Sequence, residues 1–187
     1  MRAQLFALKA LQHYSIPFTG LKTGKHQFEY EVDKRFFDEF EHSIIKDGRL
    51  HVSLVLEKQE IFLVLQFHIR GEIKLSCDVC LADYPSKIDI EERLIVKFGG
   101  DEDWENDTEE VIILTKKDHE IDVSLPIYEY INLAAPYVSR CDSEGNSSFC
   151  DQEMIAKLKA LSGKQKEQKK DVDPRWDALK KIQINKN

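Results

Sequence analysis

The sequence lacks any long hydrophobic run. Its longest apolar runs, Ile61–Leu65 and Val111–Leu114, fall far short of the roughly 20 residues that a membrane-spanning helix requires. It also lacks the pattern of a secretory signal peptide, because Lys9 interrupts the short apolar stretch Leu5–Leu8 and no small-residue cleavage site follows. These two absences predict a cytoplasmic protein that makes no contact with a membrane.

The motifs of the common enzyme classes are absent as well. There is no nucleophile elbow or dinucleotide fingerprint, and Gly20–Gly24 lacks the Gly-Lys-Ser/Thr ending of a phosphate-binding loop. The six histidines show no HExxH or comparable spacing, and we expect His51 and His68 to lie on the polar face of strands. The acidic stretch Asp101–Asp107, which contains Trp104, lacks the Gly and Glu of an EF-hand loop and predicts a solvated loop. We therefore expect neither an enzyme nor a small-molecule substrate.

Cysteine is scarce, with four in 187 residues, but two of the four stand two residues apart in Cys77-Asp-Val-Cys80. Two thiolates on a tight turn can bind one tetrahedral ion, and zinc accepts such sulfur ligands in closed structural sites. Cys141 and Cys150 would complete the set, although their separation is longer than that of a usual zinc knuckle. The pattern favours a structural zinc site with Cys77, Cys80, Cys141 and Cys150 as ligands.

Two other interpretations of the cysteines remain open at this point. The four could be ordinary reduced cysteines, two of them half-buried, as free cysteines often are. Cys77 and Cys80 could also form a redox pair. A thioredoxin-type pair opens a helix, whereas this one leads into another predicted strand, and Asp78 places a negative charge beside the thiols. The redox interpretation is therefore the weakest of the three.

Charge is unevenly distributed along the chain. Residues 156–187 carry ten Lys and Arg against four Asp and Glu, a net of +6, so the preceding 155 residues carry −13 of the total of −7. Such an acidic body repels phosphate backbones, and any contact with nucleic acid should involve the basic end. The alternative is that the basic end is simply a solvated tail.

Alternating apolar and polar residues predict several strands. These cover residues 26–32, 52–56, 61–69, 73–77, 88–90 and 94–98, followed by a short buried strand over Val111–Leu114. The polar stretch Glu57–Glu60 predicts a hairpin turn, and Gly71 predicts a break in the alternation. Gly99–Gly100 predicts a loop that ends near Glu110.

Helices are predicted by caps and by helical spacing. Asp33 caps a short helix in which Val32 and Phe37 form a hydrophobic staple and Phe36 and Phe40 share a face. A longer helix is predicted over Ile121–Ala135, capped by Asp122 or Ser124 and ended by Pro136, with one face formed by Leu125, Tyr128, Ile131 and Ala135.

Two further helices are predicted towards the C-terminus. Asp151–Leu161 carries an apolar stripe of Met154, Ile155, Leu158 and Leu161, with Gly163 just beyond its end. After the lysine-rich linker Lys164–Val172, Asp173 and Pro174 fit the first positions of a last helix, on which Trp176, Leu179 and Ile182 share a face.

Strands followed by helices predict an α+β fold, with a mainly antiparallel β sheet or barrel-like core, a few helices and a more helical C-terminal half. We predict one α+β domain over residues 1–163, which carries the cysteine pair. Residues 164–187 form a basic linker and a short amphipathic helix.

Two motifs in the middle and at the end of the chain resemble those of one known family. Cys77-Asp-Val-Cys80-Leu81, followed by Tyr84, is similar to the CxxCL signature of the YceD family of predicted metal-binding proteins, and Asp173–Ile182 resembles that family's C-terminal DPR…L…KL element. The segment Ile121–Pro136 matches the family's order of parts. The chain departs from the pattern after this segment, where many relatives have a dense GLCPxCG knuckle and only Cys141 and Cys150 stand here.

The resemblance implies a role in the accumulation or processing of large-subunit ribosomal RNA, as in bacteria and plastids. It also implies binding to nucleic acid or to assembling ribosomal particles, without known catalysis. Combined with the charge distribution, it predicts that RNA or a partner protein is bound by the C-terminal segment, through Lys164, Lys166, Lys169, Lys170, Asp173, Pro174, Arg175 and Trp176.

Three functions therefore follow from the sequence, in order of preference. The first is a ribosome-biogenesis accessory factor that binds precursor RNA, a large-subunit ribosomal protein or an assembling particle. The second is a metal-stabilised protein–protein interaction module without RNA contact. The third is an oxidoreductase that uses Cys77 and Cys80.

Overall fold

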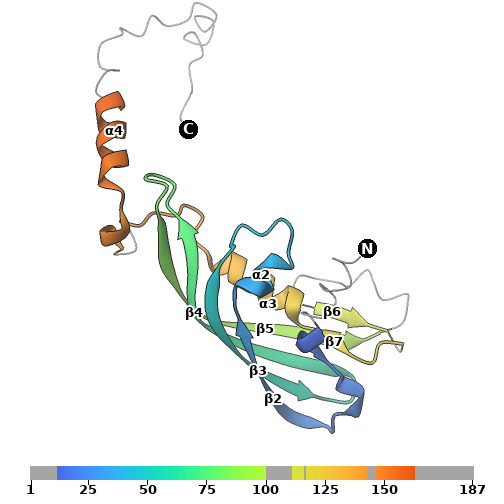
Figure 1. Ribbon diagram of the computed structural model, residues 1–187. Helices are drawn as coiled ribbons and strands as arrows, with labels where there is room; N and C mark the ends of the chain where they lie inside the picture. Colours follow the sequence, from blue (N-terminus) through green and yellow to red (C-terminus); the bar gives the residue numbers. More distant parts are fainter. Residues whose placement is uncertain (1–11, 100–110, 116, 143–145, 163–187) are drawn as a thin grey trace, which may run out of the picture. The chain divides into compact units, whose positions relative to one another are not determined.

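A computed structural model describes residues 12–99, 111–115, 117–142 and 146–162 of the chain (Figure 1). The chain divides into two compact units, residues 1–150 and residues 151–187. In the second unit the described part is helix α4 (Gln152–Ser162). The domain boundary that we predicted between residues 163 and 164 lies at the end of the described residues and stays a prediction.

A five-stranded sheet forms the main element of the first unit. Its strands in spatial order are β2 (Gly24–Val32), β3 (Gly48–Lys58), β4 (Phe62–Ser76), β5 (Asp83–Phe98) and β6 (Val111–Leu114). The pairs from β2 to β5 are antiparallel, and β6 pairs with β5 in parallel. In the described part of the chain the sheet is open. The predicted α+β fold with an antiparallel sheet is thus confirmed, and the barrel-like alternative is not what forms.

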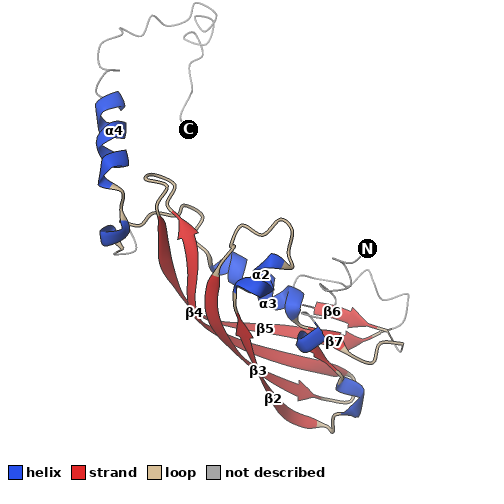
Figure 2. Ribbon diagram, viewed as in Figure 1, coloured by secondary structure: helices blue, strands red, loops and turns tan. Residues whose placement is uncertain are grey.

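Helices α2 (Lys34–Asp38) and α3 (Ser124–Ala134) lie on one side of this sheet (Figure 2). Short 3₁₀ turns occupy Gln12–Tyr14 (η1), Phe18–Gly20 (η2) and Ser147–Phe149 (η4), and β1 (Ser15–Ile16) pairs antiparallel with β7 (Ile121–Asp122). Because α3 and α4 both lie in the second half of the chain, the prediction of a more helical C-terminal half is confirmed. None of the helices within the described ranges has the length and apolar character needed to span a membrane.

The core lies between the helices and one face of the sheet. Alternate residues of β3 and β4 face it, and each buried Leu or Ile contributes about 1.5–3 kcal/mol by leaving water. Phe67 packs edge-on against Tyr130 at 5.3 Å, and Phe40 stacks on Tyr128 at 3.9 Å, measured between ring centroids. Fully buried members of this core include Leu50, Leu54, Leu56, Leu63, Leu65, Ile69, Ile127 and Ile131.

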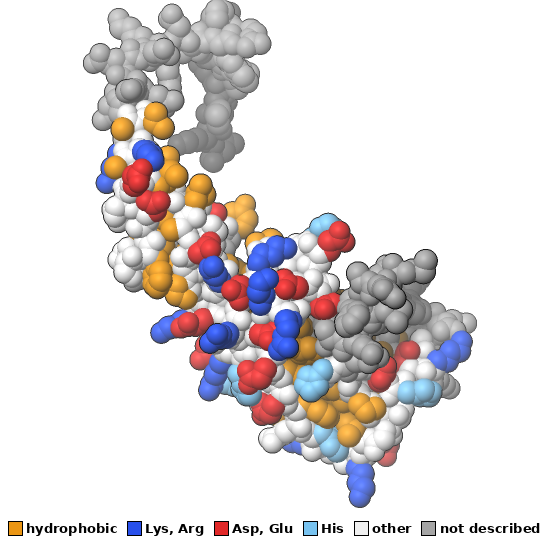
Figure 3. All heavy atoms as spheres, in the orientation of Figure 1, with side chains coloured by type: hydrophobic (Ala, Val, Ile, Leu, Met, Phe, Trp, Pro, Cys, Tyr) orange, Lys and Arg blue, Asp and Glu red, His pale blue; other side chains and the backbone are white. Residues whose placement is uncertain are grey.

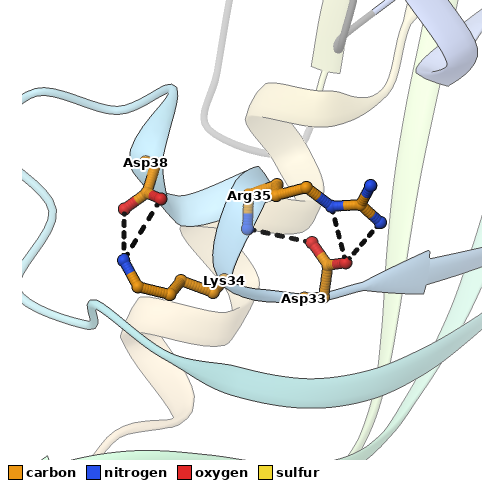
Figure 4. Close-up of polar contacts among 4 residues, drawn as sticks. All are labelled: Asp33, Lys34, Arg35 and Asp38. Atoms are coloured by element: carbon orange, nitrogen blue, oxygen red, sulfur yellow. Dashed lines mark hydrogen bonds and ion pairs between the residues drawn. The ribbon is translucent and has the colours of Figure 1, made fainter.

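The start of α2 is capped as the sequence predicts (Figure 4). The Asp33 carboxylate accepts a hydrogen bond of 2.9 Å from the backbone N–H of Arg35. It also forms an ion pair of 2.6 Å with the Arg35 guanidinium. The next turn carries an ion pair of 3.3 Å between Lys34 and Asp38. Val32 and Phe37 are both buried, so these local interactions direct the chain from β2 into the helix.

Gly71 does not interrupt the sheet, and the predicted break there was wrong. β4 runs through it as one strand from Phe62 to Ser76. Gly71 has φ +148°, and a Cβ atom at this position would meet the Arg49 carbonyl oxygen and lie 2.7 Å from the Leu50 Cα. The glycine is there because β3 approaches β4 too closely for a side chain.

The residues predicted for 121–135 form two elements. Ile121–Asp122 is strand β7, and α3 begins only at Ser124, where the Asp122 carboxylate accepts a 2.8 Å hydrogen bond from the Ser124 N–H. The predicted helix face is partly wrong, since Leu125 is 52% exposed. The buried residues of α3 are Ser124, Pro126, Ile127 and Ile131.

The strands predicted over residues 88–90 and 94–98 are parts of one long strand, β5, which begins at Asp83. β6 has the predicted bounds, but all four of its residues are half-buried and not buried. β6 is the end strand of the sheet in the described part, so one side of it lacks a neighbouring strand there.

Candidate metal centre

The first two cysteines lie on the turn that joins β4 to β5. The Cys77 N–H donates to the Ala82 carbonyl at 2.9 Å, and the Leu81 N–H donates to the Cys77 carbonyl at 2.9 Å. Leu81 has φ +62°, a left-handed conformation that costs a non-glycine residue about 1 kcal/mol or more. This tight closure turns both sulfur atoms to the same side.

The third cysteine comes from the segment that follows α3. Pro136 lies just after the helix, and the chain then passes beside the β4–β5 turn. The Asp78 N–H donates to the Ser139 carbonyl at 2.8 Å, and the Ser139 N–H donates to the Asp78 carboxylate at 2.7 Å. These two hydrogen bonds bring Cys141 to Cys77 and Cys80.

The sulfur atoms of Cys77, Cys80 and Cys141 all lie within 4.8 Å of one another, and the three residues are 1%, 2% and 1% exposed. The Cys80 and Cys141 sulfur atoms are 3.8 Å apart. A tetrahedral zinc ion with Zn–S bonds of about 2.3 Å separates its sulfur ligands by about 3.8 Å. The spacing therefore suits a tetrahedral thiolate site, and the three buried cysteines can hold a metal ion.

Cys150, the predicted fourth ligand, is half-buried and lies just after η4. It is not among the three cysteines whose sulfur atoms are mutually within 4.8 Å, although the thiols of Cys141 and Cys80 both act on its pKa. Four residues before Cys150, the Asn146 N–H donates to the Cys141 carbonyl at 2.9 Å. The role of Cys150 as the fourth ligand stays a prediction.

The protonation of the cluster is uneven. Backbone N–H groups, that of Cys80 foremost, lower the pKa of the Cys77 thiol to about 6, against the opposing effect of burial. Burial, followed by the neighbouring thiols, raises the pKa of Cys141 to about 12. Burial likewise raises the pKa of Cys150. The cluster therefore carries negative charge on Cys77 at neutral pH, and a cation would relieve the cost of ionising the remaining thiols.

The redox interpretation gains nothing from the lowered pKa of Cys77. A reactive thiolate must be accessible, yet Cys77 is 1% exposed, and it lies on the turn between β4 and β5 and not in the first turn of a helix. Its N–H donors stabilise a thiolate, which is also the form that binds a metal ion.

The histidines that we expected on the polar face of the sheet have carboxylate partners there. His51 lies 2.7 Å from Glu29 and 2.8 Å from Glu31, and His68 lies 3.0 Å from Asp89. Neither belongs to the cysteine cluster found among the described residues. His51 and His68 therefore lie on the polar face of strands, as the sequence predicted, with carboxylates as their partners.

The predicted RNA- or partner-binding residues lie outside the described residues. The same holds for the acidic stretch 101–107 with Trp104, for Gly163 and for the predicted helix over 173–182. These predictions therefore concern Lys164, Lys166, Lys169, Lys170, Asp173, Pro174, Arg175 and Trp176 as sequence positions alone.

Sequence reasoning missed the residues that hold the centre together. We interpreted Asp78 only as an unfavourable charge beside a thiolate, whereas its carboxylate closes the contact with Ser139. The Asn146 amide was missed too, and it donates to the Pro85 carbonyl of β5 at 2.8 Å. No local pattern marks either contact, since both partners lie 61 residues apart in the chain.

Comparison with known proteins identifies the family. The model of the family described as large ribosomal RNA subunit accumulation protein YceD matches residues 65–183, which is more than half of the chain. The chain belongs to the YceD family. No curated protein and no solved structure matches the sequence or the fold significantly.

Membership in the YceD family confirms the resemblance inferred from the CxxCL and DPR motifs, and it associates the chain with the large ribosomal subunit. The matched region contains the cysteine cluster and the basic C-terminal segment together. In this YceD protein the cluster joins the β4–β5 turn to the segment after α3, two parts of the fold that are distant in sequence.

Proposed function

We propose that the protein is a ribosome-biogenesis accessory factor that promotes the accumulation or processing of large-subunit ribosomal RNA in the cytoplasm. It binds precursor RNA, a ribosomal protein or an assembling particle. It acts by binding and is not an enzyme, and it has no small-molecule substrate. The observation that carries the proposal is the match to the YceD family over residues 65–183.

In this proposal the metal ion is zinc and its role is structural. Cys77, Cys80 and Cys141 are its ligands, and Cys150 completes the tetrahedron. Support comes from the burial of the three clustered thiols and from the 3.8 Å sulfur–sulfur distance between Cys80 and Cys141. A closed site of four thiolates offers no open coordination position, so the ion would stabilise the fold and not take part in catalysis.

The contact with RNA is proposed for the basic C-terminal segment. The charge of the chain supports this assignment, because residues 156–187 carry a net of +6 and the remainder carries −13. Lys164, Lys166, Lys169 and Lys170 would contact phosphates, and Arg175 and Trp176 would anchor the segment on its partner.

The decisive experiment is depletion of the protein from the cells that make it, followed by complementation. Wild-type chain should restore the level of mature large-subunit ribosomal RNA. A variant with Lys164, Lys166, Lys169 and Lys170 changed to Ala should be stable but restore it poorly, whereas a matched variant with the exposed Lys22, Lys46, Lys87 and Lys97 changed to Ala should restore it fully. Unchanged ribosomal RNA and particle profiles after depletion would refute the proposal.

A second candidate function, a protein–protein interaction module without RNA contact, is favoured by the surface around the cysteine cluster. Leu81, Val138 and Phe149, each within three residues of a clustered cysteine or of Cys150, are 66%, 53% and 49% exposed. Hydrophobic side chains are visible at the end of the first unit where β4 and β5 meet (Figure 3). Exposed apolar groups gathered in this way are typical of contact surfaces.

A cavity of about 290 Å³ adjoins this surface, with Ile73, Pro85 and Phe149 in its lining. It offers room for one side chain of a partner, and its lining also includes the charged residues Asp47, Arg49, Glu72, Lys74 and Asp83. In this second function, Phe149→Ser would abolish co-purification of partners and nuclease treatment would have no effect. Salt-sensitive co-purification of RNA would instead favour the first function.

A further inference from the structure

The outer edge of β2 is an unpaired strand edge in the described part of the chain. Among the described strands β2 pairs with β3 alone, and it lies at the end of the sheet (Figure 1). Within that part, the one hydrogen bond made by its outward backbone groups is from the Tyr14 hydroxyl to the Glu31 carbonyl at 3.0 Å. A nine-residue strand with a free edge is a template for another strand.

The register shows which groups face outwards. At the β3–β4 turn the Gln59 N–H donates to the Phe62 carbonyl, so Gln59 is a hydrogen-bonded position of the β3–β4 ladder. Such positions alternate along an antiparallel strand, so the backbone N–H and C=O groups of the odd-numbered residues of β3 point to β4 and those of the even-numbered residues point to β2. In β2 the even-numbered residues therefore bond to β3, and the odd-numbered ones point their N–H and C=O groups outwards. The contact between Tyr14 and the Glu31 carbonyl agrees with this assignment. The outward residues are Lys25, Gln27, Glu29 and Glu31.

From this edge we propose that two copies of the protein associate through β2, antiparallel, about a two-fold axis that passes between the two Phe28 residues. In this register the whole strand is used, because Gly24 faces Val32 of the second copy. Gln27 faces Glu29 and Lys25 faces Glu31, and both are pairs of outward-pointing residues that can exchange backbone hydrogen bonds. The two five-stranded sheets then join into one continuous sheet.

The charges of the edge fit a second copy and not an arbitrary strand. Charged residues on an edge usually prevent pairing with a like edge. Here Lys25 at one end and Glu31 at the other become two symmetric opposite-charge pairs, and no like charges face each other. A register shifted by one step so that Glu29 faces Glu29 would place like charges opposite each other. A register with Gln27 facing Gln27 would place Lys25 opposite Glu29, but it would leave Glu31 and Val32 of each copy without a partner in the strand. Charge order and strand length together therefore favour the full-length register.

The side chains concerned are available for this contact. Lys25 is 70% exposed and 4.0 Å from Glu57, and Glu31 is 82% exposed beside His51. On the other face of the strand Phe28 is half-buried, so pairing would remove its remaining apolar surface from water. The Glu31 carbonyl, which accepts from Tyr14, keeps a second lone pair for the new strand.

Sedimentation of the full chain over a range of concentrations tests this proposal. Wild-type protein should show a monomer–dimer equilibrium. Lys25→Glu and Glu31→Lys should each raise the dissociation constant about tenfold or more, because each creates two like-charge pairs. The double variant K25E/E31K should restore dimerisation to near the wild-type level. An equimolar mixture of the two single variants should form heterodimers, since both of their cross-strand pairs are attractive.

Two controls accompany these variants. Lys87→Glu makes the same charge change on an exposed residue of β5 and should leave the dissociation constant unchanged. Gln27→Pro removes an outward N–H without breaking the β2–β3 ladder and should weaken the dimer. Wild-type protein that stays monomeric at every concentration overturns the proposal. A dimer that responds to neither charge variant, or that the double variant fails to restore, overturns it as well.

Discussion

Asp78 and Ser139 hold each other by two reciprocal hydrogen bonds across a sequence separation of 61 residues. The backbone N–H of Asp78 donates to the Ser139 carbonyl at 2.8 Å, and the Ser139 N–H donates to the Asp78 carboxylate at 2.7 Å. Through this contact the turn that carries Cys77 and Cys80 meets the segment that carries Cys141. The position of the third thiol therefore depends on a residue that is not itself a ligand.

Removing the Asp78 carboxylate should loosen the centre. We expect Asp78→Ala to cost roughly 1 kcal/mol of unfolding free energy, because one charge-assisted hydrogen bond is lost, and to weaken zinc binding by about tenfold or more. Chemical denaturation and competition with a chelator measure the two effects. Asp78→Asn is the matched control, because its amide oxygen can still accept from Ser139. Equal stability and zinc affinity in wild type and D78A would contradict this account of the contact.

Zinc content should follow the cysteine cluster. Elemental analysis of reduced wild-type protein should give one zinc per chain. Cys77→Ser, Cys80→Ser and Cys141→Ser should each lose the metal, and each should lower the melting temperature because a structural site contributes directly to folding. Cys150→Ser should retain zinc with reduced affinity if Cys150 is the fourth ligand. A metal-free wild type would leave four plain cysteines, and full zinc content in C150S with unchanged affinity would remove Cys150 from the ligand set.

Zinc binding should release protons and weaken in acid. At pH 7 the Cys77 thiol, with a pKa of about 6, is already ionised, whereas Cys141, with a pKa of about 12, still carries its proton. Binding must therefore expel at least the Cys141 proton, and affinity should fall further as the pH drops through 6 and Cys77 becomes protonated. Calorimetry in two buffers of different ionisation enthalpy measures the release. A heat that does not depend on the buffer would contradict the prediction.

Two buried tyrosines should make the protein sensitive to alkali. Burial, as the largest cause, raises the pKa of both Tyr14 and Tyr30 to about 12 from the usual 10. Folding thus favours the neutral phenols, and their contribution to stability is complete below pH 10 and is lost as the pH rises from 10 to 12. Absorbance titration of the folded protein and urea denaturation at several pH values measure this loss. Tyr14→Phe should flatten the pH dependence, and an unchanged slope would contradict the assignment.

Gly71 and Gly24 form a matched pair for testing the close approach of β3 and β4. Both have positive φ, +148° and +126°. A Cβ at Gly71 would collide with the backbone of Arg49 and Leu50, whereas a Cβ at Gly24 meets nothing within 4 Å. We expect Gly71→Ala to lose about 3 kcal/mol or more of unfolding free energy and Gly24→Ala about 1 kcal/mol. Similar losses in the two variants would show that backbone strain alone matters at Gly71.

Local patterns in the sequence determined much of the fold. Period-two alternation located β2, β3 and β4, and the Asp33 cap with its hydrophobic staple located α2, because these signals act over a few residues. The same patterns misjudged Gly71, since the reason for a glycine there is a neighbouring strand and not the chain on either side. They also misjudged which residues α3 buries, because Ile127 and Pro126 face the sheet through tertiary packing that helical spacing alone does not reveal.

The cysteine centre, too, was determined partly by the sequence and partly by the tertiary structure. The spacing of Cys77 and Cys80 was enough to predict that two thiols share one turn, because two residues between ligands suit a single ion. The sequence offered Cys141 only as a candidate for the same site, and the tertiary structure decided that its sulfur lies 3.8 Å from that of Cys80. Distant segments are brought together there by hydrogen bonds of Asp78, Ser139 and Asn146. No local sequence pattern predicts these bonds, because their partners lie 61 residues apart.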